Sequence, residues 1–445
     1  MTNPQTPVPF AFEALRRHPD VEAANLFATD AADRLILDVA SDSLTTSQPR
    51  EVVVIGDQYG ALTLGAAALH GVRGLRVHQD ALTGERALAE NARRFGLHDE
   101  YASHELGAEL LAGARIVLLR LPKSLTALEE ITQTIANDAR EDVTVYAGGM
   151  LKHMTRSMND VFAVCFADVQ AGLARQKARV LTASTGRVVP AGRVLAAGRV
   201  ASASERIETR DADLDADLDS GLDTLVPRYS TAGAARYSTA GAARYSTAGA
   251  ARYSPNEVWP RREYHADLQL WVCAHGGAFA GTSIDIGTRF LLEYLDQAKP
   301  AAASAIDLGC GTGVLATALA KARSDIRVLA VDQSTAAVAS ARATAGANGV
   351  ADRVEVLRDD ALASRADAPA ELILLNPPFH LGSSVHAGAG LRLIEDAGRV
   401  LAPGGELWTV FNSHLAYQQT LRRRIGLTRE VGRNAKFTVT VSTKR

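Results

Sequence analysis

The 445-residue sequence is short of cysteine. Only Cys165, Cys273 and Cys310 occur, and their positions show no spacing typical of metal ligands. A small and uneven number of cysteines also argues against a disulfide framework. We therefore expect neither a metal site nor a disulfide-stapled domain.

Long apolar runs are also missing. No run approaches the ~18 residues that cross a bilayer. The first seven residues, Met1 to Pro7, lack the basic and then apolar pattern of a secretory signal. We therefore expect a cytoplasmic protein without a membrane segment.

Neither sign of charge is in excess. The chain has 48 Lys and Arg against 50 Asp and Glu, a formal net charge of −2, so any RNA-binding surface must be local. Hydrophobic and charged contents of 47% and 22% are values of a globular chain. The length exceeds one ordinary core, and two domains are expected.

A short apolar segment that ends in two prolines stands out in the second half. Glu371–Leu375 predicts a buried parallel strand, and Asn376-Pro377-Pro378-Phe379 follows at once. Two prolines cannot continue a sheet ladder, so the chain must turn outward there. In open α/β sheets ligands sit at this end of the strands. The sequence therefore predicts an amide and an aromatic face in a cleft, as a planar amine substrate requires.

A glycine-rich turn lies upstream of that strand. The predicted strand Ala305–Leu308 runs into Gly309-Cys310-Gly311-Thr312-Gly313, and a predicted helix follows at Val314–Ala322. Glycines let a backbone approach a ligand closely, beside the helix N-terminal amides. Such a turn alone is weak evidence, because several nucleotide-binding folds use it.

Acidic residues end the next two predicted strands. Arg327–Val331 leads to Asp332, which is placed to accept hydrogen bonds from both hydroxyls of a ribose. Val354–Leu357 leads to Asp359, Asp360 and Ala361, within reach of an adenine edge. These strand ends, together with the glycine turn and Asn-Pro-Pro-Phe, form a much stronger signal than the turn alone.

These motifs carry a resemblance to a known family. Asp307-Leu-Gly-Cys-Gly-Thr-Gly313 with Asn376-Pro-Pro-Phe379 resembles class I S-adenosylmethionine-dependent methyltransferases that act on an exocyclic or amide nitrogen. His380, with His275–Phe279 and Thr282–Phe290, narrows the resemblance to bacterial ribosomal RNA guanine-N2 methyltransferases of small-subunit type C and large-subunit type G. The large-subunit type is more similar, on the segments Asp57–Leu62, Leu121–Leu125, Asn412–Tyr417 and Asn434–Phe437.

The resemblance implies S-adenosylmethionine as cofactor, and ribosomal RNA or a ribosomal subunit as partner. Asn376 and the carbonyl of Pro377 would accept the N–H groups of the guanine amine, and Phe379 would stack on the flipped base. The catalytic assignment is therefore Asn376, Pro377, Pro378 and Phe379. The cofactor assignment is Phe279, Asp307, Gly309, Cys310, Gly311, Gly313, Asp332, Gln333, Asp360, Ala361 and Asn376. We expect no metal, and a monomer.

Other functions remain open at this point. Adenine-N6 and glutamine-N5 methyltransferases resemble the same motif, although many carry Tyr where this chain has Phe379. A non-catalytic RNA-binding assembly factor is a further alternative, but the intact glycines, Asp332 and Asn376 argue against it.

Individual residues also have simpler interpretations. Phe279 and Phe290 fit plain core positions, and Asp285 fits a helix cap. The basic segment Arg422–Lys436 fits a solvated face as well as a phosphate contact.

The first half reads as a degenerate copy of the second. Ile55–Leu62 aligns with Leu308–Leu315, and Leu118–Pro122 aligns with Leu374–Pro378. His78 takes the place of Asp332, Gln58 that of Gly311, and Arg120 that of Asn376. The predicted architecture is thus two tandem doubly wound α/β folds of class I methyltransferase type, with an inactive first copy. Arg120 suits a phosphate, so we expect this half to help hold RNA.

Three local predictions rest on weaker sequence patterns. Helices are expected at Phe10–Arg17 and Asn25–Ala40. The alternation of Phe437, Val439 and Val441 with hydroxyl residues predicts an edge strand with one buried face.

A low-complexity segment separates the halves. An Arg-Tyr-Ser-Thr-Ala-Gly-Ala-Ala unit recurs every eight residues from Arg228, after an acidic run at Asp211–Asp219. The period fits neither helix nor strand, and the unit has little apolar bulk, so disorder is expected. The alternative is that its Arg and Tyr bind RNA. The predicted boundaries are 1–200, 201–262 and 263–445.

Overall fold

A computed structural model of the chain describes residues 8–184, 243–244, 257–365, 369–377, 384–415 and 417–445, with only the backbone at 243–244 and 384–389. Of the predicted linker 201–262, only Ala243–Arg244 and residues 257–262 are among the described residues, and Pro378, Phe379 and His380 lie outside them. Within the described ranges, no helix is long and apolar enough to cross a membrane.

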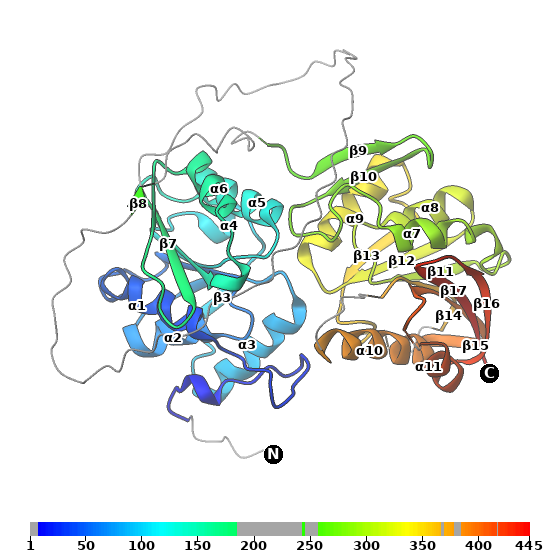
Figure 1. The fold of residues 1–445 in the computed structure, drawn as a ribbon, viewed down its shortest axis with the longest axis horizontal. Helices are drawn as coiled ribbons and strands as arrows, with labels where there is room; N and C mark the ends of the chain where they lie inside the picture. Colours follow the sequence, from blue (N-terminus) through cyan, green and yellow to red (C-terminus); the bar gives the residue numbers. More distant parts are fainter. Residues whose placement is uncertain (1–7, 185–242, 245–256, 366–368, 378–383, 416) are drawn as a thin grey trace, which may run out of the picture. The chain divides into compact units, whose positions relative to one another are not determined.

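The first half is built on one mixed sheet with helices on both faces (Figure 1). Its strand order is β3-β2-β1-β4-β5-β7-β6-β8, and the neighbours from β3 to β5 are parallel. The strands are β1 Val52–Ile55, β2 Leu75–His78, β3 Tyr101–Ser103, β4 Ile116–Arg120, β5 Thr144–Met150, β6 Asp168–Ala171, β7 Ala178–Ser184 and β8 Ala243–Arg244. The helices are α1 Ala31–Thr45, α2 Ala61–His70, α3 Leu82–Phe95, α4 Ala108–Leu111, α5 Leu125–Asp138 and α6 Ser157–Cys165, with 3-10 turns η1 Phe12–Ala14 and η2 Leu151–His153.

Alternation along the central strands divides the interior of this half into two cores. Val52 and Val54 of β1 pack in the core beneath α1, α2 and α3. Val53 and Ile55 pack on the opposite face, in the core with α4, α5 and α6. Because side chains of a strand point alternately to the two faces, a continuously apolar strand must be covered on both.

The second half repeats this architecture. Its sheet has the order β13-β12-β11-β14-β15-β17-β16, with parallel neighbours from β13 to β15. The strands are β11 Ser304–Leu308, β12 Arg327–Asp332, β13 Val354–Arg358, β14 Ala370–Leu375, β15 Leu401–Asn412, β16 Gly426–Arg433 and β17 Phe437–Lys444. The helices are α7 Ile286–Leu292, α8 Val314–Ala322, α9 Thr335–Ala347, α10 Ser384–Val400 and α11 Tyr417–Arg424, with the 3-10 turn η4 Leu295–Gln297. The hairpin β9 Arg261–His265 and β10 Leu270–Ala274 precedes them.

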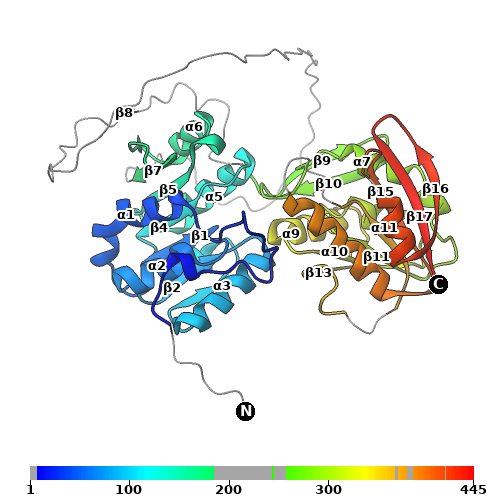
Figure 2. The same cartoon turned by 60° about the horizontal axis from the view of Figure 1, so that its bottom comes forward.

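The two faces of the second sheet are covered by different helices (Figure 2). Buried residues of α7, α8 and α9 pack with Leu372 and Leu374 of β14. Ile394 of α10 and Leu421 of α11 pack with Ile373 and Leu375 on the other face. The site elements β11, β12 and β14 therefore lie in the interior of a doubly covered sheet.

The predicted duplication is confirmed by topology and register. Both sheets place their first seven strands in the same spatial order. Ile55 pairs with His78 and Leu119, and Leu308 pairs with Val331 and Leu375. The aligned sequence positions therefore occupy equivalent places in two copies of one fold.

Two of the local predictions need correction. In place of a helix at Phe10–Arg17 there is only the short turn η1. Helix α1 begins at Ala31 rather than near Asn25, because Asp30 caps it and forms a capping box with Asp33.

The edge-strand prediction for β17 is wrong. This strand lies between β15 and β16, and its residues 437–442 are buried on both faces. Buried hydroxyl residues resemble a solvent-facing row in the sequence, which explains the error.

Candidate active site

The carboxyl ends of β11, β12, β13 and β14 open onto one cavity. In the second half it is lined by most of the predicted site residues, namely Phe279, Asp307, Gly309, Cys310, Gly311, Asp332, Gln333, Asp360, Ala361, Asn376 and Pro377. Asp285 and Thr288 line it as well. Four strand ends that are far apart in sequence thus meet at one place, as expected for an open α/β sheet.

The glycine turn leaves its backbone open to this cavity. Gly309, Gly311 and Gly313 have φ angles of 72°, 52° and 75°, in the left-handed region. A Cβ added at Gly309 or Gly311 would meet nothing within 4 Å, whereas one at Gly313 would lie 2.8 Å from Ala341 of α9. The first two glycines thus keep space free for a ligand. Gly313 does not line the cavity and allows α8 to pack closely on α9.

Asp307 and Cys310 are two buried groups at this turn. Asp307 at the end of β11 accepts a hydrogen bond from the amide of Ala316 in the first turn of α8, at 2.9 Å. Burial raises the pKa of Asp307 to about 7 and raises the pKa of the Cys310 thiol well above its usual range. Asp307 therefore serves as a cap of α8 as well as part of the cavity wall.

Asp332 connects the turn to the end of β12. One carboxylate oxygen accepts from the amide of Gly311 at 3.0 Å, and the other accepts from the amide of Ser334 at 3.0 Å. Burial is the largest cause of the raised pKa of Asp332. Each oxygen has a further lone pair, so the carboxylate is fixed in place and still able to accept from a ligand hydroxyl.

The third acidic position lies after β13. Asp360 is buried, and its Oδ2 accepts from Nη2 of Arg392 on α10 at 2.8 Å. Asp359 instead holds the local turn, because it accepts from the amide and hydroxyl of Ser364. Asp360 is thus the more available of the two, although part of its charge is already balanced by Arg392.

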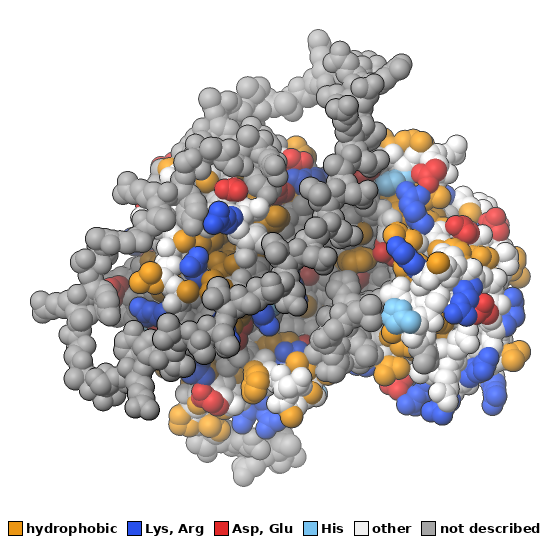
Figure 3. Space-filling view, viewed as in Figure 1, with side chains coloured by type: hydrophobic (Ala, Val, Ile, Leu, Met, Phe, Trp, Pro, Cys, Tyr) orange, Lys and Arg blue, Asp and Glu red, His pale blue; other side chains and the backbone are white. Residues whose placement is uncertain are grey.

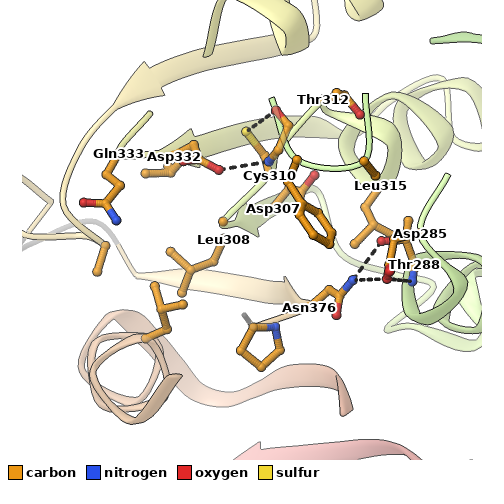
Figure 4. Close-up of a pocket in the computed structure, with 18 of the residues that line it drawn as sticks. Asp285, Thr288, Asp307, Leu308, Cys310, Thr312, Leu315, Asp332, Gln333 and Asn376 are labelled. Carbon is orange, nitrogen blue, oxygen red and sulfur yellow. Dashed lines mark hydrogen bonds between the residues drawn. The ribbon is translucent and has the colours of Figure 1, made fainter. Parts of the chain in front are cut away.

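Asn376 lies at the end of β14, and the nitrogen of its side-chain amide donates two hydrogen bonds. Its Nδ2 donates to Oδ2 of Asp285 at 3.0 Å and to Oγ1 of Thr288 at 2.9 Å. Its Oδ1 is buried and accepts no hydrogen bond from any described residue. Figure 4 shows the nitrogen directed to Asp285 and Thr288 and the oxygen directed away from both.

The sequence interpretation assigned Asp285 only a capping role and did not single out Thr288. Asp285 does cap α7, since it accepts from the amides of Gly287 and Thr288. The only sequence signal for its second contact was its place in the Thr282–Phe290 motif. Of the two aromatic residues, Phe290 is buried against Tyr294 in the core, while Phe279 is 60% exposed and lines the cavity.

The equivalent turn of the first half has the same backbone shape and different contents. Gly56, Gln58 and Gly60 also have positive φ angles, of 76°, 61° and 101°. Asp57 accepts from the amides of Leu62 and Thr63 in the first turn of α2, at 2.7 and 2.8 Å. The carboxylate that caps the helix has therefore moved from the strand, where Asp307 lies in the second half, into the turn itself.

Arg120 is ion-paired within the first half. Its guanidinium donates two hydrogen bonds of 2.7 Å to the carboxylate of Asp30, and it lies 3.2 Å from an oxygen of Asp33. Hydrogen bonding and charge from these carboxylates outweigh burial and raise the pKa of Arg120. The charge of Arg120 is therefore balanced inside the first half, and its role in holding RNA stays a prediction.

The carboxy-terminal basic segment is on the surface. Its members Arg422, Arg423, Arg424, Arg429, Arg433 and Lys436 are all exposed. Arg424 pairs with Glu395 at 2.8 Å. On the face shown in Figure 3, Lys and Arg side chains lie at several places on the second half, with acidic side chains beside some of them. Among the residues described, no group of three or more His, Cys, Asp or Glu is placed to hold a metal ion.

Comparisons with known proteins match both halves. The "Methyltransferase small domain" model matches residues 269–441, and the "RLMG N-terminal domain" model matches residues 3–187. The chain is 32% identical to the ribosomal RNA large subunit methyltransferase G of Streptomyces avermitilis, over the full length of both chains. It is 30% identical to the protein of the same name from Pseudomonas paraeruginosa, over 97% of each chain.

One solved structure matches nearly the whole chain. It is the T. thermophilus 16S rRNA N2 methyltransferase RsmC, in complex with AdoMet and guanosine. The TM-score is 0.62 at 18% identity, and the match covers 94% of this chain and 95% of that one. At this identity the match shows that the two proteins share the tandem fold.

Proposed function

The chain belongs to the ribosomal RNA large subunit methyltransferase G family, and from this premise we propose that it methylates the exocyclic N2 amine of a guanine in ribosomal RNA. Large-subunit RNA is favoured over small-subunit RNA. The observation that carries the proposal is the buried, unpaired Oδ1 of Asn376 at the cavity wall. A buried acceptor without a partner is costly, and an amine N–H would satisfy it.

The cavity fits S-adenosylmethionine as cofactor. The space above Gly309 and Gly311, which any Cβ would fill, suits the methionine part of that molecule. The fixed carboxylate of Asp332 suits the two ribose hydroxyls, and Asp360 with Ala361 suits the adenine. The bound cofactor supplies an electrophilic methyl group.

The protein's part in the reaction is to position the amine. Guanine N2 is a weak nucleophile, because its lone pair is delocalised into the ring. Oδ1 of Asn376 accepts one N–H and the carbonyl of Pro377 accepts the other, which favours the pyramidal geometry of an attacking nitrogen. Orientation of this kind accounts for a large share of the acceleration when two reactants must meet in line.

The remaining site assignments belong to the same proposal. Phe379 lies outside the described residues, and we assign it to stacking on the flipped base from its place in the motif. We keep the domain boundaries 1–200, 201–262 and 263–445, with a first domain that binds no cofactor. The exposed Lys123, Arg175 and Lys177 of that domain are its other candidates for RNA contact. The protein would act as a cytoplasmic monomer.

The direct test is transfer of labelled methyl to protein-free large-subunit and small-subunit RNA, followed by mapping of the modified base. The proposal expects label on the N2 of one guanine, in large-subunit RNA. Label on an adenine or on protein would replace it with adenine-N6 or glutamine-N5 methylation. If no substrate accepts label while RNA still binds, the assembly-factor alternative holds.

A further inference from the structure

The side-chain amide of Asn376, a residue that lines the cavity, has two orientations that differ by a half-turn, and only the observed one leaves its oxygen without a described partner. An amide that accepts from a substrate amine must therefore be held against rotation. The structure has both Nδ2 hydrogens engaged, by Oδ2 of Asp285 at 3.0 Å and by Oγ1 of Thr288 at 2.9 Å. Reversing the amide would place its oxygen against the acceptor Oδ2 of Asp285 and would replace the bond to Thr288 with one donated by the Thr288 hydroxyl, so the carboxylate is what opposes the reversal.

The carboxylate of Asp285 is itself fixed. Its Oδ2 also accepts from the amide of Gly287 at 2.9 Å and from the amide of Thr288 at 3.2 Å, at the beginning of α7. An ionised carboxylate has no hydrogen to donate. Asp285 therefore favours the nitrogen of Asn376 and disfavours its oxygen, whatever occupies the cavity.

Space beside the amide is tight at Gly287. A Cβ at this position would lie 3.0 Å from Oδ2 of Asp285 and 3.3 Å from Oδ1 of Asn376. A larger residue would therefore disturb both the carboxylate and the amide. Asp285, Gly287 and Thr288 belong to the start of one helix, so one local structure sets both sides of the amide.

We propose that Asp285 and Thr288 are positioning residues that lock Asn376 with Oδ1 toward the substrate. The inference rests on the proposed function, because it assumes that the substrate group is an amine. It deepens that function, since a locked acceptor selects a group that donates N–H over a carbonyl oxygen. Neither residue needs to touch the base.

Turnover in matched variants of the full-length protein tests the lock. Thr288→Val keeps the side-chain shape and loses the acceptor, whereas Thr288→Ser keeps the hydroxyl. Thr288→Val should lower kcat roughly fivefold, the value of one neutral hydrogen bond, with unchanged cofactor affinity. Thr288→Ser should stay near the wild type.

Asp285 needs a variant that preserves the helix cap. Asp285→Ser retains a good N-cap but its hydroxyl is too short to reach Asn376, while Asp285→Asn retains an acceptor oxygen of the same length. Asp285→Ser should lower kcat roughly tenfold or more, and Asp285→Asn should recover most of that loss. Equal melting temperatures for the two variants would show that the cap is intact in both.

A double-mutant comparison separates positioning from general packing. In an Asn376→Ala background there is no amide to orient, so Thr288→Val should have no further effect on turnover. An undiminished fivefold loss in that background would overturn the proposal. So would wild-type turnover in both Thr288→Val and Asp285→Ser.

Side-chain amide NMR supplies a readout that does not depend on activity. With [15N]asparagine labelling, the NH2 pair of Asn376 is identified by its disappearance in Asn376→Ala. The pair should exchange slowly with D2O in the wild type and faster in Thr288→Val. Rapid exchange in the wild type would contradict the lock. If slow exchange is found but no guanine is methylated, the proposed function fails while the fixed amide stands.

Discussion

The two halves share a fold and a turn with positive φ angles at the same three positions, yet they differ at several positions that would touch a ligand. Gly311 of the second half leaves open space, whereas Gln58 puts a side chain at the equivalent place in the first; Gly309 keeps a glycine counterpart in Gly56. Both copies still cap the same helical position, Ala316 in one and Thr63 in the other. The contacts that stabilise the fold are thus kept in both halves, whereas the positions that would contact a ligand differ.

The polar residues at the aligned strand ends also differ between the halves. In the second half Asn376 presents an unpaired acceptor, while Arg120 of the first half is neutralised by Asp30 and Asp33. His78, which replaces Asp332, interacts through its Nδ1 with the carbonyl of His104 at 3.0 Å. At Arg120 and His78 the first half pairs its polar groups internally, whereas Asn376 of the second half leaves an acceptor without a described partner.

The largest expected effect is on turnover and follows a change at Asn376, at the end of β14. Asn376→Ala should raise the activation free energy by on the order of 2–4 kcal/mol and so lower turnover, because it removes an acceptor used in the transition state. Cofactor affinity should stay nearly unchanged, because the amide faces the amine. Single-turnover kinetics beside calorimetric titration measure both, and unchanged turnover would remove Asn376 from the mechanism.

The matching change in the first half should affect stability rather than turnover. Arg120→Ala leaves Asp30 and the buried Asp33 without their partner, at a cost of about 2–3 kcal/mol, toward the low end for such pairs since Asp30 is partly exposed. Urea unfolding measures it, with turnover assayed well below the melting temperature. A stable protein that has lost RNA affinity would instead support the phosphate role of Arg120.

Substitutions at Asp332 and at its counterpart His78 should differ in their effect on cofactor affinity. Asp332→Ala removes a charged acceptor and should weaken S-adenosylmethionine binding by about 1.5–3 kcal/mol. His78→Ala, at the equivalent position of the first half, should leave the affinity unchanged. Equal losses in the two variants would mean that both folds contribute to cofactor binding.

The smallest effect concerns the pH dependence of stability. Burial raises the pKa of Asp307 to about 7, against 3.8 when exposed, so the folded state holds a proton between these values that the unfolded state has lost. Stability from this group is present below pH 4 and is lost as pH rises to 7. Asp307→Asn has no such proton, so its stability relative to wild type should rise by roughly 1 kcal/mol or more from pH 4 to pH 8.

Urea midpoints at several pH values measure this trend. A constant difference between Asp307→Asn and the wild type across the range would place the Asp307 carboxyl in a more polar environment than the structure gives it.

Much of the fold was predictable where local signals agree. The predicted helix at Val314–Ala322 matches α8 residue for residue. It follows Gly313, a glycine in the left-handed conformation, which marks the start of the helix. The apolar segment Glu371–Leu375 likewise predicted the buried strand β14.

Two other features were predicted wrongly. The start of α1 is set by the capping box of Asp30 and Asp33, which ends the irregular segment before it. The place of β17 in its sheet depends on which strand pairs beside it, and this is set by tertiary packing rather than by the residues of β17.

In the site, the sequence identified side chains but not their partners. The Asn376 contacts with Asp285 and Thr288 join residues 91 and 88 positions apart, and Arg120 and Asp30 are 90 apart. An isolated motif gives no information on a hydrogen bond of that range. Asn376 therefore looked like an open amide and Arg120 like a free cation.

The central claim is that one fold of the pair binds cofactor and the other does not. Isothermal titration of the full-length protein with S-adenosylmethionine tests it most directly. The account predicts one site per chain, weakened in Asp332→Ala and retained in His78→Ala. Two sites per chain, or one site that survives Asp332→Ala unchanged and is lost in His78→Ala, would contradict it.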